Sequence, residues 1–175
     1  MSRRVFLYCA AVIVAVGVIA RAAEAVRITP ITQNQKVFVS FELTDAYTDA
    51  IRESIASGLR TTFSYDVALR MEAWVDRTIA TTVVTTSDQY DNLTRQHRLT
   101  RVIDGRIEDA TVTDDEAVVR SWLTTWKRLP LCETSKLDAT RDYYVRISAR
   151  ARPSAGSLLG WATAITGQTK FTFIP

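Results

Sequence analysis

Alternating apolar and polar residues dominate the chain, and a period of two is typical of a half-buried β-strand. The clearest case runs from 61 to 73, where Phe63, Tyr65 and Val67 begin one apolar face. Alternation or runs of β-branched residues predict further strands at 37–43, 78–86, 143–151 and 170–174.

Turn-forming residues separate some of these strands. Asp104-Gly105 divides the segments 97–103 and 106–112, which predicts a hairpin because both central residues of a type I′ turn need a positive φ. The polar segment 87–92 predicts a turn after the strand at 78–86.

Two segments have helical spacing instead. In the first, Tyr47, Ile51 and Ile55 recur every four residues, Thr44 or Asp45 is available as the N-cap, and Gly58 follows as a stop signal. The helix therefore begins near residue 46 and ends before Gly58.

The second helix is predicted from Asp114 to Trp126. Thr113 and Glu116 have the spacing of a capping box, and Pro130 follows the end of the helix. Its apolar stripe comprises Val119, Trp122, Leu123 and Trp126.

These elements predict an α+β fold: a mainly antiparallel β-sheet of long hairpins with two or three packed helices. The third helix depends on the segment 154–167, which fits either a short helix or an apolar loop. A β-sandwich with helical insertions is the alternative.

Residues 1–25 resemble an export signal. Arg3 and Arg4 precede the apolar run 5–20, and Ala23-Glu24-Ala25 fits a signal peptidase site. An uncleaved membrane anchor is the alternative, and the paired arginines leave both the general secretory and the twin-arginine routes open. Residues 26–175 then form a single domain, exported to the periplasm or held at a membrane.

The charge balance argues against nucleic-acid binding. The chain has 22 basic and 19 acidic residues, a net charge of +3. Without residues 1–25 the surplus is about +1, too small to neutralise many phosphates.

Basic residues do gather on one predicted strand face. Arg146, Arg150 and Arg152 share the polar face of the strand at 143–151, and Arg98 lies on the polar face of another strand. If those strands are close, these arginines form an interaction surface for an acidic partner or an anionic lipid surface. Ion pairs with outward acidic residues such as Asp66 and Glu72 are the structural alternative.

No catalytic or metal-binding pattern is evident. His97 is the only histidine, and the sequence lacks the G-x-S-x-G motif that would place a serine nucleophile beside it. A dyad of His97 with Cys132 is disfavoured because the residues around Cys132 would not lower the pKa of its thiol. We expect His97 to make a structural hydrogen bond. The acids 114–116 fit a helix first turn, and Asp88, Asp91 and Asn92 form only a weak cation candidate.

Large aromatic residues supply most of the expected core. They are Phe63, Tyr65, Trp74, Trp122, Trp126, Tyr143, Trp161 and Phe171. The functional alternative to a packed core is an apolar cavity between the sheet and the helices that holds a lipid tail.

Four segments together resemble a known family. They are VFVSFELTDAYTDAIRESIASGLRTTFSYDVALR, DQYDNLTRQHRL, TDDEAVVRSWL and YYVRISARARP. Their order is similar to that of a bacterial envelope family, the domain of unknown function 4390, over about residues 36–152. The resemblance implies an exported bacterial domain and no chemistry, and it carries over no catalytic residue.

The sequence therefore predicts a non-enzymatic, exported envelope domain that acts through protein–protein contacts and has no cofactor. A carrier or sensor of a hydrophobic ligand is the alternative, and a hydrolase using carboxylates is the third hypothesis.

Overall fold

A computed structural model describes residues 25–153 and 164–174. Residues 1–24 of the predicted export signal lie outside the described residues, as do Trp161 and most of the segment 154–167. The strands are β1 (Val26–Gln33), β2 (Lys36–Leu43), β3 (Thr61–Met71), β4 (Arg77–Asp91), β5 (Gln96–Ile103), β6 (Arg106–Thr113), β7 (Thr125–Glu133), β8 (Asp142–Pro153) and β9 (Ile165–Thr172). The helices are α1 (Asp49–Ala56), α2 (Glu116–Thr124) and a 3-10 turn at Thr134–Lys136.

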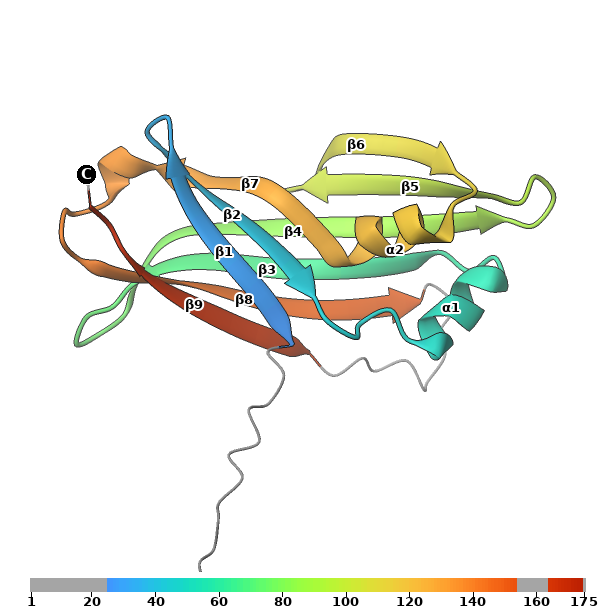
Figure 1. Cartoon of the computed structure of the whole chain (residues 1–175), viewed down its shortest axis with the longest axis horizontal. Coiled ribbons are helices and arrows are strands. Elements are labelled where there is room, and N and C mark those ends of the chain that lie inside the picture. The colour runs from blue at the N-terminus through green and yellow to red at the C-terminus, as the bar shows by residue number, and fades with distance from the viewer. Residues whose placement is uncertain (1–24, 154–163, 175) are drawn as a thin grey trace, which may run out of the picture.

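Six of the described strands form one large antiparallel sheet, in the order β6-β5-β4-β3-β8-β9 (Figure 1). The period-two pattern of β3 has the predicted outcome: Phe63, Tyr65 and Val67 are buried, and the residues between them are more exposed. Asp104 and Gly105 have positive φ in the turn between β5 and β6, which confirms the predicted hairpin.

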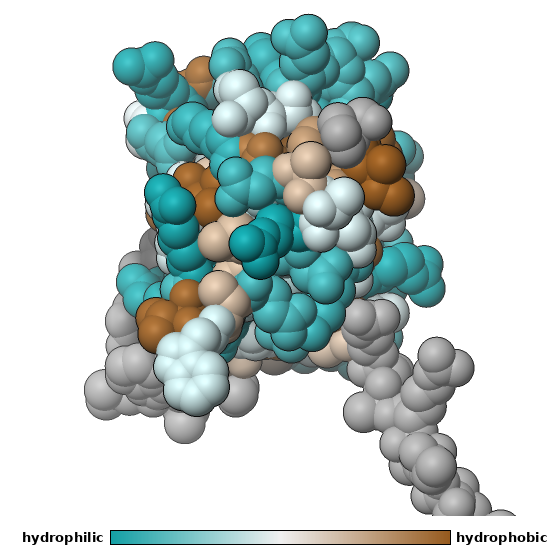
Figure 2. Space-filling view, turned by 90° about the vertical axis from the view of Figure 1, so that its left-hand side faces the viewer, coloured by the Kyte–Doolittle hydropathy of each residue, from teal (hydrophilic) through white to brown (hydrophobic). Residues whose placement is uncertain are grey.

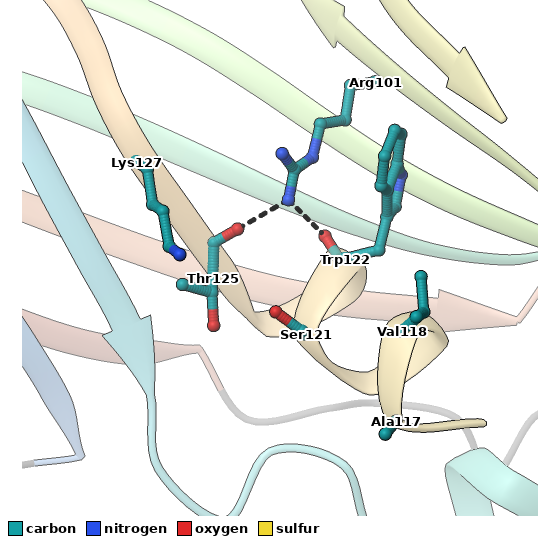
Figure 3. A pocket seen from close by; sticks show the side chains of 7 residues that line it. All are labelled: Arg101, Ala117, Val118, Ser121, Trp122, Thr125 and Lys127. Carbon is teal, nitrogen blue, oxygen red and sulfur yellow. Dashed lines mark hydrogen bonds between the residues drawn. The ribbon is translucent and has the colours of Figure 1, made fainter. Parts of the chain in front are cut away.

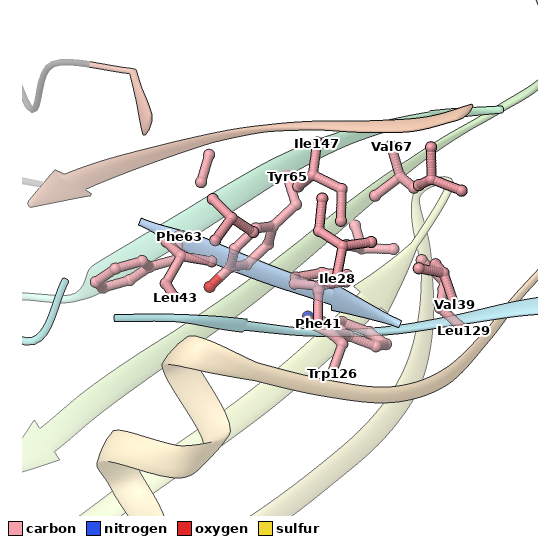
Figure 4. Packing of buried hydrophobic residues seen from close by; sticks show 14 of the residues in the cluster. Ile28, Val39, Phe41, Leu43, Phe63, Tyr65, Val67, Trp126, Leu129 and Ile147 are labelled. Atoms are coloured by element: carbon pink, nitrogen blue, oxygen red, sulfur yellow. The ribbon is translucent and has the colours of Figure 1, made fainter. Parts of the chain in front are cut away.

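The other three described strands form a smaller antiparallel sheet, β1-β2-β7, that packs across one face of the large sheet (Figures 1 and 4). Phe41 of β2 meets Tyr65 of β3 with ring centroids 5.1 Å apart. Ile28, Val39 and Leu129 lie on the same side of the smaller sheet, so the two sheets bury a shared apolar layer. The predicted α+β class of antiparallel sheet with packed helices is confirmed, and it takes the form of two packed sheets with two short helices.

One close approach joins the sheets at β1 and β9. Gly167 of β9 faces Val26, and a Cβ built on Gly167 would lie 2.7 Å from the Val26 Cβ. Because real Cβ contacts are not that short, the absence of a side chain at Gly167 allows β1 to pack at this distance.

The helix predictions are partly wrong at their ends. In α1 the N-cap is Thr48, whose hydroxyl accepts from the Ile51 N–H at 3.4 Å, not Thr44 or Asp45. In α2 the predicted capping box does not form, because Asp115 is the N-cap and accepts from the Ala117 N–H at 2.8 Å.

Two strands were missed and two were predicted too short. One of the latter is β9, which begins at Ile165, inside the segment predicted as a short helix or an apolar loop. β1 was not predicted, and β7 begins where the second helix was expected to continue, so Trp126 is a strand residue. Pro130 is tolerated because β7 is an edge strand. Residues 87–91 are not a turn: β4 continues through Asp91, since β5 pairs with it up to that residue, and the turn begins at Asn92.

Candidate functional site

The predicted interaction surface lies on the open face of the large sheet. Arg146, Arg150 and Arg152 project from β8 on the side opposite to the buried Val145 and Ile147. We call these three residues the arginine stripe. At about 3.3 Å per residue it is about 20 Å long.

The neighbours of the arginine stripe on β3 are small. Ala68 lies opposite Arg146, Ser64 opposite Arg150 and Thr62 opposite Arg152. The two helices and the smaller sheet pack on the other face, so none of the described elements covers the stripe. The guanidinium groups of the stripe therefore extend beyond the short side chains that lie beside them on β3.

Carboxylates neutralise only part of this surface. Arg150 lies 3.6 Å from Asp66, while no described residue forms an ion pair with Arg146 or Arg152. The exposed Arg98 is on the same face but three strands away, and it lies 3.8 Å from Asp91. Arg98 is therefore separate from the stripe and has its own acidic neighbour.

His97 makes the structural hydrogen bond that the sequence predicted. Its Nδ1 lies 2.8 Å from Oδ2 of Asp88, whose side chain is fully buried on the core face of β4. The Tyr90 ring lies 4.6 Å from the imidazole. Burial raises the pKa of Asp88, and the hydrogen bond from His97 opposes that rise.

A pocket of about 320 Å³ adjoins this pair. Its polar lining includes Tyr47, Glu116 and Arg52, besides His97. Burial, reinforced by the charges of Glu116 and Asp88, raises the pKa of Tyr47 to about 12. The described lining contains no Ser, Thr or Cys side chain, and its hydroxyl groups are those of Tyr47 and Tyr90.

The remaining sequence candidates do not meet. Cys132 is a partly buried free thiol on β7, and burial raises its pKa. Asp88 pairs with His97, whereas Asp91 accepts the Leu93 and Thr94 amides, so the two acids have separate roles. In the described part of the chain, no group of three His, Cys, Asp or Glu residues is placed to hold a metal ion.

Two tryptophans assigned to the core have other positions. Trp74 is fully exposed in the loop between β3 and β4, next to the exposed Val75. Figure 2 views the end of the molecule where this loop lies, and its apolar residues form separate patches among hydrophilic ones. Trp122 is only partly buried, whereas Trp126 is buried as predicted.

Arg101 is the functional candidate that the sequence analysis missed. It projects from the core face of β5, and its Nη2 donates to the carbonyls of Trp122, at 3.1 Å, and Thr125, at 2.7 Å (Figure 3). The carbonyl between them, on Leu123, accepts from the hydroxyls of Tyr65 and Thr86. Side chains of three adjacent strands thus satisfy the C-terminal end of α2.

A second pocket, of about 410 Å³, opens beside Arg101 and is called the α2 pocket. Its lining includes Arg101, Lys127, Ser121, Thr125, Val118 and Trp122 (Figure 3). The only sequence signal for the α2 pocket is Arg101 itself, a charged residue at a core-facing position of a predicted strand. The alternation pattern does not indicate which groups Arg101 contacts.

In the described residues no helix has the length and apolar character needed to span a membrane. A family model described as "Domain of unknown function (DUF4390)" matches residues 20–158 of the chain. No curated protein and no solved structure matches it.

Proposed function

The chain belongs to the DUF4390 family, and from that premise we propose that it is a non-enzymatic domain that binds an acidic protein segment through the open face of its large sheet. The observation that carries the proposal is the arginine stripe, in which Arg146 and Arg152 have no ion-pair partner among the described residues. Unpaired guanidinium groups on a flat surface favour carboxylates, which they bind through two parallel hydrogen bonds.

The spacing of the stripe suits an extended acidic segment. Arg146, Arg150 and Arg152 share one strand face, so their side chains are separated by multiples of about 7 Å. A partner strand or extended peptide presents alternate side chains with the same period. A partner with acids at every second or fourth residue therefore matches the stripe.

The proposal of export has a different basis. It depends on residues 1–25, whose charged start, apolar run and Ala23-Glu24-Ala25 fit a cleaved signal, with an anchor as the alternative. An intact mass that begins at Val26 supports cleavage, and a mass that includes Met1 refutes it.

In-cell photo-cross-linking tests the binding proposal. A photoreactive residue replaces Ser148, which lies between Arg146 and Arg150 on the open face. We expect one cross-linked protein whose peptide at the junction is acidic, and we expect it to disappear in the triple variant Arg146→Ala/Arg150→Ala/Arg152→Ala.

A matched variant controls for the loss of three positive charges. Lys36, Arg106 and Lys136 are exposed and lie away from the stripe, so their replacement by Ala should leave the cross-link unchanged. Equal loss of the cross-link in both variants would show a net-charge effect and would reject the stripe as the binding surface.

A further inference from the structure

The α2 pocket presents a guanidinium group that is held in one position. The Nη2 of Arg101 is occupied by the two carbonyls at the end of α2. The guanidinium carbon also lies 4.3 Å from the ring centroid of Trp122 and 4.8 Å from that of Trp126. Because both contacts exist without a ligand, ordering this side chain adds little cost to binding.

The same arrangement leaves donor capacity unused. No described acceptor bonds to Nη1 of Arg101, which carries two N–H groups. Arg101 is only partly buried and lines the pocket, so a ligand can approach it. Figure 3 shows the guanidinium above Thr125, with the ammonium of Lys127 on the opposite side of that residue.

The pocket therefore has two positive side chains and no acid. Lys127 is exposed on β7, and no described Asp or Glu is within ion-pair distance of it or of Arg101. Asp109 is the cross-strand neighbour of Arg101, but the two side chains form no ion pair; burial lowers the pKa of Arg101, and the charge of Asp109 only opposes that shift. Two like charges that line one pocket without a carboxylate favour the binding of an anion.

The rest of the lining has a different character. Ser121 and Thr125 contribute hydroxyl groups, and Val118 leaves 40% of its surface exposed at the rim. The Trp122 ring adds an apolar wall. A ligand that fills the pocket therefore has an anionic group at one end and an apolar group at the other.

We propose that the α2 pocket binds a small organic anion, in which a carboxylate or phosphate group lies between Arg101 and Lys127 and an apolar substituent contacts Val118 and Trp122. This site is separate from the arginine stripe, since it lies on the core side of the large sheet next to α2. Either proposal can fail without the other.

Isothermal titration calorimetry of the whole chain tests the site with four probes: acetate, inorganic phosphate, octanoate and octyl phosphate. We expect the two octyl-chain anions to bind at least tenfold more tightly than acetate and phosphate, because burial of CH₂ groups adds affinity. The stronger of the octyl probes identifies whether carboxylate or phosphate is the preferred group. Octanol, which lacks the charge, should bind at least tenfold more weakly than octanoate.

Variants at exposed positions assign the effect to this pocket. Lys127→Ala should weaken the binding of octanoate and octyl phosphate about tenfold or more, and Lys127→Arg should restore most of it. Lys136→Ala removes the same charge from another exposed site and should change nothing. Val118→Ser should reduce the advantage of the octyl chain without affecting acetate.

Three results would overturn the proposal: absence of binding by all four anions, equal binding of octanol and octanoate, or unchanged binding in the Lys127→Ala variant. Circular dichroism of each variant accompanies the titrations, so that loss of binding is compared only between folded proteins.

Discussion

Leu123 and Trp122 are adjacent but lie on different faces of α2, so their replacement by Ala should lower the free energy of unfolding by very different amounts. Leu123 is fully buried between the helix and the sheets. Its replacement by Ala removes three buried carbon atoms and leaves a cavity, for which we expect a loss of about 3 to 4 kcal/mol in the free energy of unfolding.

Trp122 is the larger residue but should matter less. Its side chain is only partly buried, and the hydrogen bond from Arg101 is to its backbone carbonyl, which Trp122→Ala preserves. The variant loses the ring contact with the guanidinium and part of an apolar contact, so we expect a loss of about 1 to 2 kcal/mol. A fully buried Trp122 ring, as the sequence pattern predicts, would instead cost about 3 to 5 kcal/mol on replacement by Ala.

Urea unfolding followed by far-ultraviolet circular dichroism measures both values without dependence on tryptophan fluorescence. Val118→Ala is the control on the same helix, and we expect a change within about 0.5 kcal/mol because Val118 is exposed. If Trp122→Ala costs as much as Leu123→Ala at an unchanged m-value, the assignment of the two helix faces is wrong.

Three further predictions follow from buried contacts. His97→Ala leaves the buried carboxylate of Asp88 without its partner, so it should lower the free energy of unfolding by about 2 to 4 kcal/mol at pH 7. Burial raises the pKa of Asp88, and the variant lacks the His97 hydrogen bond that opposes this rise. Protonation of Asp88 therefore restores more stability to the variant than to the wild-type protein, and the deficit should shrink as the pH falls from 7 toward 4. A constant deficit in urea titrations at pH 7, 5.5 and 4.5 contradicts this. Gly167→Ala should cost about 1 to 3 kcal/mol in thermal unfolding, since its Cβ meets Val26, and an unchanged Tm would show that β1 moves freely. Cys132→Ser should leave partner cross-linking intact and the native thiol should label slowly, because burial raises its pKa; rapid labelling at pH 7 rejects an inert thiol.

The candidate sites differ in how much of them the sequence revealed. The strand parity of β8 was enough to put Arg146, Arg150 and Arg152 on one exposed face, because the period of a strand is independent of its surroundings. The parity of β5 likewise puts His97 on the same face as the buried Leu99. Parity did not identify Asp88 as the partner of His97. Asp88 lies in a polar segment, and such a segment predicts a turn; only the pairing of β4 with β5 shows that Asp88 is a strand residue beside His97.

Local pattern by itself determined the long strands, the hairpin at Asp104-Gly105 and the existence of both helices, since each depends on residues that are neighbours in sequence. Tertiary structure decided where α2 ends. The carbonyls of its last turn are satisfied by Tyr65, Thr86 and Arg101, which come from three strands that precede the helix in the chain. It also decided that β1 and β7 pair with β2 as a second layer, because their moderate apolar pattern becomes a buried face only when the large sheet lies opposite. The α2 pocket also depends on this packing of the two sheets. Arg101 and Lys127 line one pocket only because β5 and β7, from different sheets, both lie beside α2.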